Sequence, residues 1–438
     1  MHNGFDIPAH TAIMRELLRL NPGDASAVRN GLIWFDASLK QYRDAVAKRN
    51  DEHHAARDIA YAVTNYYQTR FDQLNATPDQ ICKMANAVAA MQATAAALDE
   101  LDNSPDYTAP SYHHNPHNIL VMGTRLMMYR YDYPAQKLTP EIIINIIHNE
   151  TITMVHDILH NGRTNRRLLN RTPDLYHPAW LEMQSYRRLE PILREHRFLP
   201  DEINRAQWML IPTDPGLPGE IAKYGHALHH DACLPVQPWH ELEKQVADSP
   251  AETQDYMRQF MNAIREDKTL ARDALALKAA DMSPAFGLQA AFGHHLALDL
   301  NLEYERCGAR QILNEQGNPD PPGQLFAMIN FIGVRISNQG PCLSFLAPAA
   351  DELYGPVLGD IAVSMINHVL TSPDGEKQMK KIWQDFRAGK VLINEAGREI
   401  CISEGAANDD LAWRALLKTS TDLACRRHTQ PRPSTPSP

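Results

Sequence analysis

Residues 139–160 read TPEIIINIIHNETITMVHDILH, and this stretch decides the fold. Taken alone, its run of isoleucines is typical of a β-strand. Thr139-Pro140 is instead typical of a helix start, and polar residues recur every four positions from Asn145 to Thr153. That spacing, together with the length of the stretch, favours a helix. We therefore predict a buried helix over residues 142–159.

Helical patterns also dominate the rest of the chain. Residues 31–104 contain three or four of them, including an alanine-rich segment over 81–101 that follows the start signal Thr77-Pro78-Asp79-Gln80. We predict an all-α protein, built as a compact bundle of many helices. Further helices are expected at residues 178–195, 200–212, 251–266, 268–281, 285–315, 324–336, 342–371 and 374–388.

A change in pattern near the C-terminus suggests how the chain is organised. Two short apolar runs flank a glycine-containing turn within residues 391–402 and predict a small β-hairpin, with an irregular loop as the alternative. The role of the first 60 residues stays open: they could form a homodimer, cover the site or complete the bundle. The predicted units are an N-terminal helical extension (1–60), the main domain (61–388), the hairpin with a C-terminal helix (389–425) and a disordered tail (426–438).

The composition limits the function and the compartment. The chain has 438 residues, a formal net charge of -10 and a pI of about 6.0, which argues against a nucleic-acid polymer as the partner. Its six cysteines are widely spaced, as expected for free thiols in a reducing compartment. No signal peptide and no apolar run of about 18 residues stands out, so we expect no membrane span. A cytoplasmic protein is the simplest inference, and signal-independent secretion stays open.

Two histidine pairs of equal spacing indicate a metal site. His113 and His117 are four residues apart, and so are His156 and His160, with Asp157 beside the second pair. Residues four apart share one face of a helix. Imidazole and carboxylate suit zinc, while carboxylate and water suit Mg²⁺ or Mn²⁺. The chain has 20 histidines, so a single pair would carry little weight. The combination predicts a metal centre.

A further carboxylate is available downstream. Ala280-Asp281-Met282-Ser283-Pro284 ends an apolar helix, where an aspartate could also be an ordinary cap residue. Together with Tyr112-His113-x-x-x-His117 and His156-Asp157-x-x-His160-x-Gly162-x-x-Asn165, this segment resembles the catalytic domain of class I cyclic-nucleotide phosphodiesterases, a branch of the HD-domain superfamily. The resemblance extends from about residue 60 to about residue 370 and is patchy outside these motifs.

The resemblance implies a mechanism. Two metal ions, expected to be Zn²⁺ and either Mg²⁺ or Mn²⁺, would share a bridging hydroxide that opens a 3',5'-cyclic nucleotide to the 5'-monophosphate. His113 resembles the general acid of the family, His160 the histidine beside the hydroxide, and Glu182 the glutamate that orients His113. The implied ligands of the tighter metal are His117, His156, Asp157 and Asp281, with Asp157 also bridging to the second ion.

The expected substrate contacts match the family less well. Gln339 resembles the glutamine that reads the purine edge, and Tyr112 and Asn165 are also assigned to substrate binding. Thr213-Asp214 resembles a Thr-Asp segment of the family. However, Cys342 stands where the family usually has a phenylalanine that stacks on the base.

Two alternatives keep the same fold. One is an HD phosphohydrolase that acts on another nucleotide or on a phosphorylated small molecule, in which Gln339 has no role. The other is a non-catalytic binding or effector protein. The presence of His113 argues against the second alternative, because a binding protein has no use for a general acid.

Overall fold

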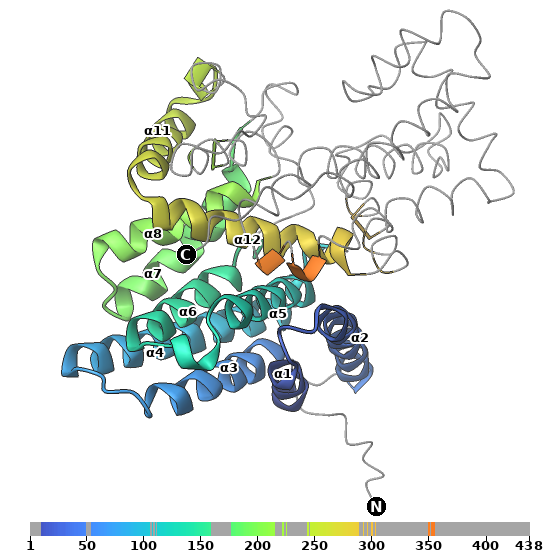
Figure 1. Ribbon diagram of the computed structural model, residues 1–438. Coiled ribbons are helices and arrows are strands. Elements are labelled where there is room, and N and C mark those ends of the chain that lie inside the picture. Colours follow the sequence, from blue (N-terminus) through green and yellow to red (C-terminus); the bar gives the residue numbers. More distant parts are fainter. Residues whose placement is uncertain are drawn as a thin grey trace, which may run out of the picture.

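Helices are the only regular elements in the described part of the chain, which confirms the predicted all-α class (Figure 1). The computed structural model describes residues 10–49, 54–105, 112–158, 177–214 and 246–288, with short pieces within 107–110, 221–244, 292–303 and 349–354. Gln339, the hairpin at 391–402 and the tail at 426–438 lie outside these ranges, as do the helices predicted at 324–336 and 374–388.

Several helices begin where the sequence predicted. Before α4, the Thr77 side chain accepts a hydrogen bond from the Gln80 N–H at 3.3 Å, and the Gln80 side chain accepts one from the Thr77 N–H at 2.7 Å. Thr139 caps α6 in a similar way. The helices are α1 (His10–Arg19), α2 (Ala25–Arg49), α3 (Ala55–Phe71), α4 (Pro78–Asp102), α5 (Asn115–Asp132), α6 (Pro140–Thr153), α7 (Trp180–Glu195), α8 (Pro200–Leu210), α11 (Ala251–Glu266) and α12 (Lys268–Gly287), with short 3-10 helices η1 (Ala135–Lys137) and η2 (Ile211–Thr213).

Helix α5 is the central element of the described core. Every residue from Asn115 to Tyr129 is buried, as expected for a helix surrounded by others. Helices α2, α6 and α12 pack against it, and α12 lies across α5 in Figure 1. The N-terminal helices belong to the same core, since Ile13 of α1 and Phe35 of α2 are buried in it. The predicted domain boundary at residue 60 falls inside α3.

Helix α6 ends earlier than predicted. We expected it to reach about Leu159, but the last helical residue is Thr153, and tight turns follow. The Thr153 carbonyl accepts bonds from the backbone N–H and the ring Nδ1–H of His156, at 3.3 and 2.8 Å. In a continuing helix this carbonyl would bind the N–H of Asp157 instead. Because α6 ends early, His156 and Asp157 lie outside its regular pattern of backbone hydrogen bonds.

Helix α4 is long and apolar enough to cross a membrane by length and composition, which the sequence analysis did not expect. Its hydropathy comes largely from alanine, and it packs against α3 and α6. Asp99 near its end accepts hydrogen bonds from the first backbone N–H groups of α3. One such helix is weak evidence for a membrane span, because core helices pass the same test.

Glu150 of α6 is an unusual core residue. Its side chain is fully buried, and neither carboxylate oxygen has a hydrogen-bond partner among the described residues. The hydroxyl of Tyr67, which interacts electrostatically with Glu150, is likewise buried without such a partner. Burial raises the pKa of Glu150 from 4.5 to about 8, and Arg125 opposes the shift only in part. Glu150 is therefore protonated in the folded protein at neutral pH.

We expect Glu150→Gln to remove a pH-dependent loss of stability. The pKa of Glu150 is higher in the folded than in the unfolded protein. Its contribution to the free energy of unfolding is therefore fully present below pH 4.5 and is lost as the pH rises toward 8. At about 1.4 kcal/mol per pKa unit, the free energy of unfolding of the variant should gain about 3 kcal/mol on wild type between pH 5 and pH 7. Urea denaturation at both pH values measures this. The exposed Glu141→Gln on the same helix should show no such gain, and equal gains in both variants would contradict the assignment.

Candidate metal centre

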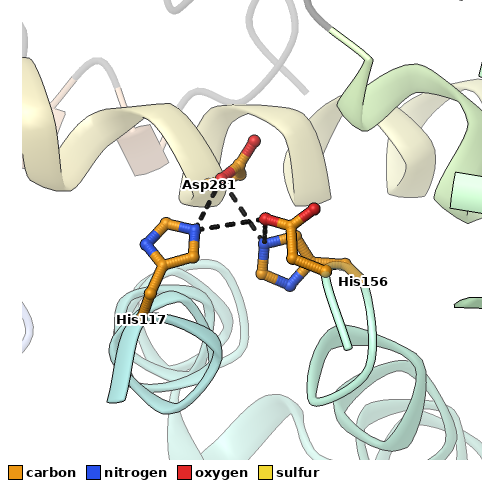
Figure 2. Close-up of side chains that lie close together, drawn as sticks. His117, His156 and Asp281 are labelled. Carbon is orange, nitrogen blue, oxygen red and sulfur yellow. Dashed lines mark ion pairs between the residues drawn. The ribbon is translucent and has the colours of Figure 1, made fainter. Parts of the chain in front are cut away.

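Four side chains from three segments meet at one end of α5. His117 comes from the first turn of α5, His156 and Asp157 from the turn after α6, and Asp281 from α12. One ligand atom from each lies within 4.8 Å of the others. Figure 2 shows the His117 and His156 rings directed toward Asp281. Sequence reasoning predicted these four residues, and the fold brings them together.

The distances are those of a shared ligand set. The Nε2 atom of His117 lies 3.4 Å from Asp157 Oδ2 and 3.2 Å from Asp281 Oδ1. The Nε2 atom of His156 lies 3.0 and 3.4 Å from the same two oxygens. Two imidazole nitrogens therefore converge on two carboxylate oxygens in a mostly buried cluster, and the four residues can hold a metal ion.

The tautomer of His156 suits a metal ligand. Its Nδ1 lies 2.8 Å from the Thr153 carbonyl oxygen. Because a carbonyl only accepts, Nδ1 must carry the proton, which leaves the lone pair of the neutral ring on Nε2. The Nε2 atoms of both His117 and His156 are buried and have no hydrogen-bond partner in the described structure. Buried nitrogens of this kind are unfavourable unless an ion or a proton joins them to the carboxylates.

The negative charge of the two carboxylates also favours a bound cation. Burial would raise the pKa of Asp157, but His156 and His113 outweigh it and hold this pKa well below its usual range. Burial raises the pKa of Asp281, but the close contacts with the His117 and His156 rings outweigh it and lower this pKa. Both carboxylates are therefore ionised. A divalent ion bound between them would neutralise this charge.

The local sequence places His117 in the first turn of α5. His114 is the N-cap, and its Nδ1 accepts a hydrogen bond from the His117 N–H at 3.1 Å. Burial, with smaller contributions from Arg43 and Lys40, lowers the pKa of His114 to about 3. His114 is thus a neutral acceptor, and Pro116 suits the first turn.

His113 lies beside the ligand set but outside it. Its Nδ1 is 2.6 Å from Glu303 Oε1, and Glu303 Oε2 accepts bonds from the backbone N–H groups of Tyr112 and His113 at 2.7 and 2.9 Å. Its other ring nitrogen, Nε2, lies 4.0 Å from Asp157 Oδ2. Burial lowers the pKa of His113, but Glu303 and then Asp157 more than compensate, so the net pKa is raised.

Sequence reasoning missed Glu303 and gave its role to Glu182. The carboxylate that holds His113 belongs to Glu303, whereas Glu182 is buried in the first turn of α7. A signal for Glu303 did exist within the helix predicted at 285–315. Leu296 and Leu300 pack against Tyr112 as a small apolar cluster, and Glu303 follows Leu300 at the spacing that keeps the same helical face.

The remaining predicted residues have mixed outcomes. The Tyr112 ring is mostly buried against His117, with ring centroids 4.5 Å apart, so it borders the cluster, and its part in substrate binding stays a prediction. His160, Asn165 and Gln339 lie outside the described residues, and their roles stay predictions. The Asp214 carboxylate accepts a bond from the Ala179 N–H at 2.9 Å. Asp214 thereby secures the start of α7, where Ala179 adopts a left-handed φ of 54°.

The chain matches no family model, no curated protein and no solved structure. The evidence for its chemistry therefore comes from its own residues.

We expect Asp281→Asn to weaken zinc binding by at least about 100-fold, because it removes both a ligand and a negative charge. The zinc dissociation constant, measured by competition with a chelator, checks this. Asp267→Asn is the matched control on the same helix. Asp267 caps α12 through the N–H groups of Thr269 and Leu270, and asparagine is an equally good cap. The control should bind zinc like wild type, and the assignment fails if both variants do.

Proposed function

We propose that this protein is a metal-dependent phosphohydrolase of the HD type, with a cyclic-nucleotide phosphodiesterase activity. The observation that carries the proposal is the position of His113. It lies next to a complete set of four ligands without belonging to it, and a buried carboxylate holds it there. A purely structural metal site needs the four ligands alone. A fixed histidine beside them has the placement of a general acid.

The geometry prepares His113 to give up a proton from Nε2. Its Nδ1–H is directed at Glu303, so Nε2 is the nitrogen that faces the ligand set. The raised pKa favours the imidazolium form, which carries a proton on Nε2 as well. Glu303 lies outside the ligand set, so its effect on His113 persists when a cation neutralises Asp157.

The four ligands would hold the tighter of two divalent ions, proposed as Zn²⁺, and Asp157 would also contact a second ion, proposed as Mg²⁺ or Mn²⁺. When bound, such ions supply Lewis-acid activation of water and neutralise charge on the phosphate. The protein's own part is to keep Asp157 and Asp281 ionised, to direct the Nε2 atoms of His117 and His156 at these carboxylates, and to place His113 at the leaving ester oxygen. Cleavage of the phosphorus–oxygen bond then coincides with proton transfer from His113 to that oxygen.

The proposed substrate is a 3',5'-cyclic nucleotide, opened to the 5'-monophosphate. This part depends on the resemblance of the motifs and on Gln339. The same four ligands and His113 would also serve an HD phosphohydrolase that acts on another nucleotide or on a phosphorylated small molecule. Substrate preference separates these two possibilities.

A hydrolysis panel tests the substrate class. Purified protein of known metal content is assayed with cyclic purine and pyrimidine nucleotides, linear nucleotides and a base-free nitrophenyl phosphodiester. Asp157→Ala serves as the background control. We expect metal-dependent formation of the 5'-monophosphate from a cyclic nucleotide, faster than hydrolysis of any linear nucleotide. Hydrolysis of linear nucleotides alone would favour the broader phosphohydrolase, and no hydrolysis above the control would overturn the catalytic proposal.

We expect His113→Ala to retain its zinc and to lose about 10²–10⁴-fold in turnover of an alkyl phosphodiester. The loss should be much smaller for a nitrophenyl ester, because nitrophenolate leaves without a proton. Steady-state rates for both ester types, together with metal analysis, measure this. Equal losses on both esters, or a loss of zinc, would remove His113 from the role of acid.

A separate prediction concerns Glu303. Replacing it with glutamine removes the nearest negative charge and should lower the pKa of His113. The acid form is required, so activity falls as the pH rises through this pKa. The alkaline limb of the pH–rate profile should therefore move to lower pH in Glu303→Gln. An unmoved limb would mean that Glu303 does not control the protonation of His113.

A further inference from the structure

A layer of buried polar side chains lies along the helices from the metal centre, around Arg125 of α5. Arg125 is fully buried. Its guanidinium donates to the carbonyl oxygen of Asn149 at 3.2 Å and to Thr153 Oγ1 at 2.7 Å, both on α6. It also donates to the carbonyl oxygen of Asp273 on α12, at 3.1 Å. One side chain thus joins α5, α12 and the end of α6, the same three segments that supply the ligands.

The Asp273 carboxylate extends this layer. Its Oδ2 accepts from Asn149 at 3.3 Å and from Arg205 of α8 at 2.7 Å, and its Oδ1 accepts from Arg272. Burial raises the pKa of Asp273, but Arg272, Arg205 and Arg125 outweigh it and lower this pKa. Asp273 is therefore ionised and well paired, as a buried charge must be.

The layer and the metal centre are in register. Arg125 follows His117 by eight residues in α5, and Asp273 precedes Asp281 by eight residues in α12. Eight helical residues span about 12 Å. Contacts form at both levels, so the two helices meet with a fixed offset. A slip of either helix would break both sets of contacts together.

Thr153 connects the layer directly to a ligand. Its hydroxyl accepts from Arg125 and donates to the Asn149 carbonyl at 2.9 Å. Its own carbonyl accepts the Nδ1–H of His156. The position and tautomer of His156 thus depend on a residue that Arg125 holds in place.

We propose that Arg125 and Asp273 are positioning residues for the metal centre, which fix the offset of α5, α6 and α12 and so set the affinity and geometry of metal binding. The inference rests on the metal-binding part of the proposed function and not on the reaction or its substrate. Arg125 donates from two nitrogens to three acceptors on two helices, which the single ammonium of lysine cannot reproduce in the same geometry.

The test uses the full chain and the metal alone. For Arg125→Lys we expect zinc binding weakened by about 10- to 100-fold, the range for partners that orient metal ligands. The visible absorption of the Co²⁺-substituted protein should also change, because it reports ligand geometry. Thr153→Val, which keeps the backbone carbonyl and the residue volume, should weaken zinc binding by about tenfold.

Phe260→Leu in the core of α11 is the control for lost stability. It should retain wild-type zinc affinity and the wild-type Co²⁺ spectrum.

Three outcomes would overturn the inference. Wild-type zinc affinity and Co²⁺ spectra in Arg125→Lys, or in Thr153→Val if the lysine variant does not fold, would show that the layer does not position the ligands. An equal loss of affinity in Phe260→Leu would show that stability alone matters. A wild-type protein that binds no zinc would overturn the metal centre itself. This failure differs from a failure of the positioning role, in which the wild-type protein binds zinc and the variants bind it equally well.

Discussion

Two carboxylates, the buried Asp157 and the partly buried Asp281, impose the constraint on which the rest of this structure depends. Ionised groups in a helical core are costly unless a countercharge lies within reach. The Nε2 atoms of two imidazoles lie 3.0 to 3.4 Å from the carboxylate oxygens, while the Nδ1–H of His156 points away to a carbonyl. A divalent cation neutralises both carboxylates and uses both lone pairs. The arrangement therefore suits a bound divalent ion.

That constraint explains why the fold must hold three helical segments at a fixed offset. Ligand atoms have to converge to within a few tenths of an ångström for a metal to bind well, whereas apolar side chains tolerate small sliding of helices. Directional bonds from a planar guanidinium remove this freedom. Arg125 satisfies acceptors on α6 and α12 at once. Glu150, which is close enough to interact electrostatically with Arg125, avoids a second unpaired charge in the same core by staying protonated.

The parts of the site that could be predicted from sequence are those coded by local spacing. The positions of His117, His156 and Asp157 follow from short motifs at helix ends, and the start of α6 follows from its cap. The early end of α6 could not be predicted, because it depends on a side chain competing for the Thr153 carbonyl. The spacing of Leu300 and Glu303 puts both on one face of a predicted helix, but the partner of Glu303 could not be predicted. Glu303 meets His113 across 190 residues of chain, and only tertiary packing brings the two together.

Glu303 also distinguishes the positions of the two histidines near the candidate metal centre. The four-residue spacing alone does not distinguish His113 from His117, and only the resemblance of the motif implied different roles for them. In the structure α5 begins at Asn115, so the two rings are not stacked on one helical face. His117 enters the ligand set, while His113 precedes the cap and is held by its own carboxylate. A helix start placed between the two histidines thus brings His117 to the carboxylates of the candidate metal centre and leaves His113 beside it, next to Glu303.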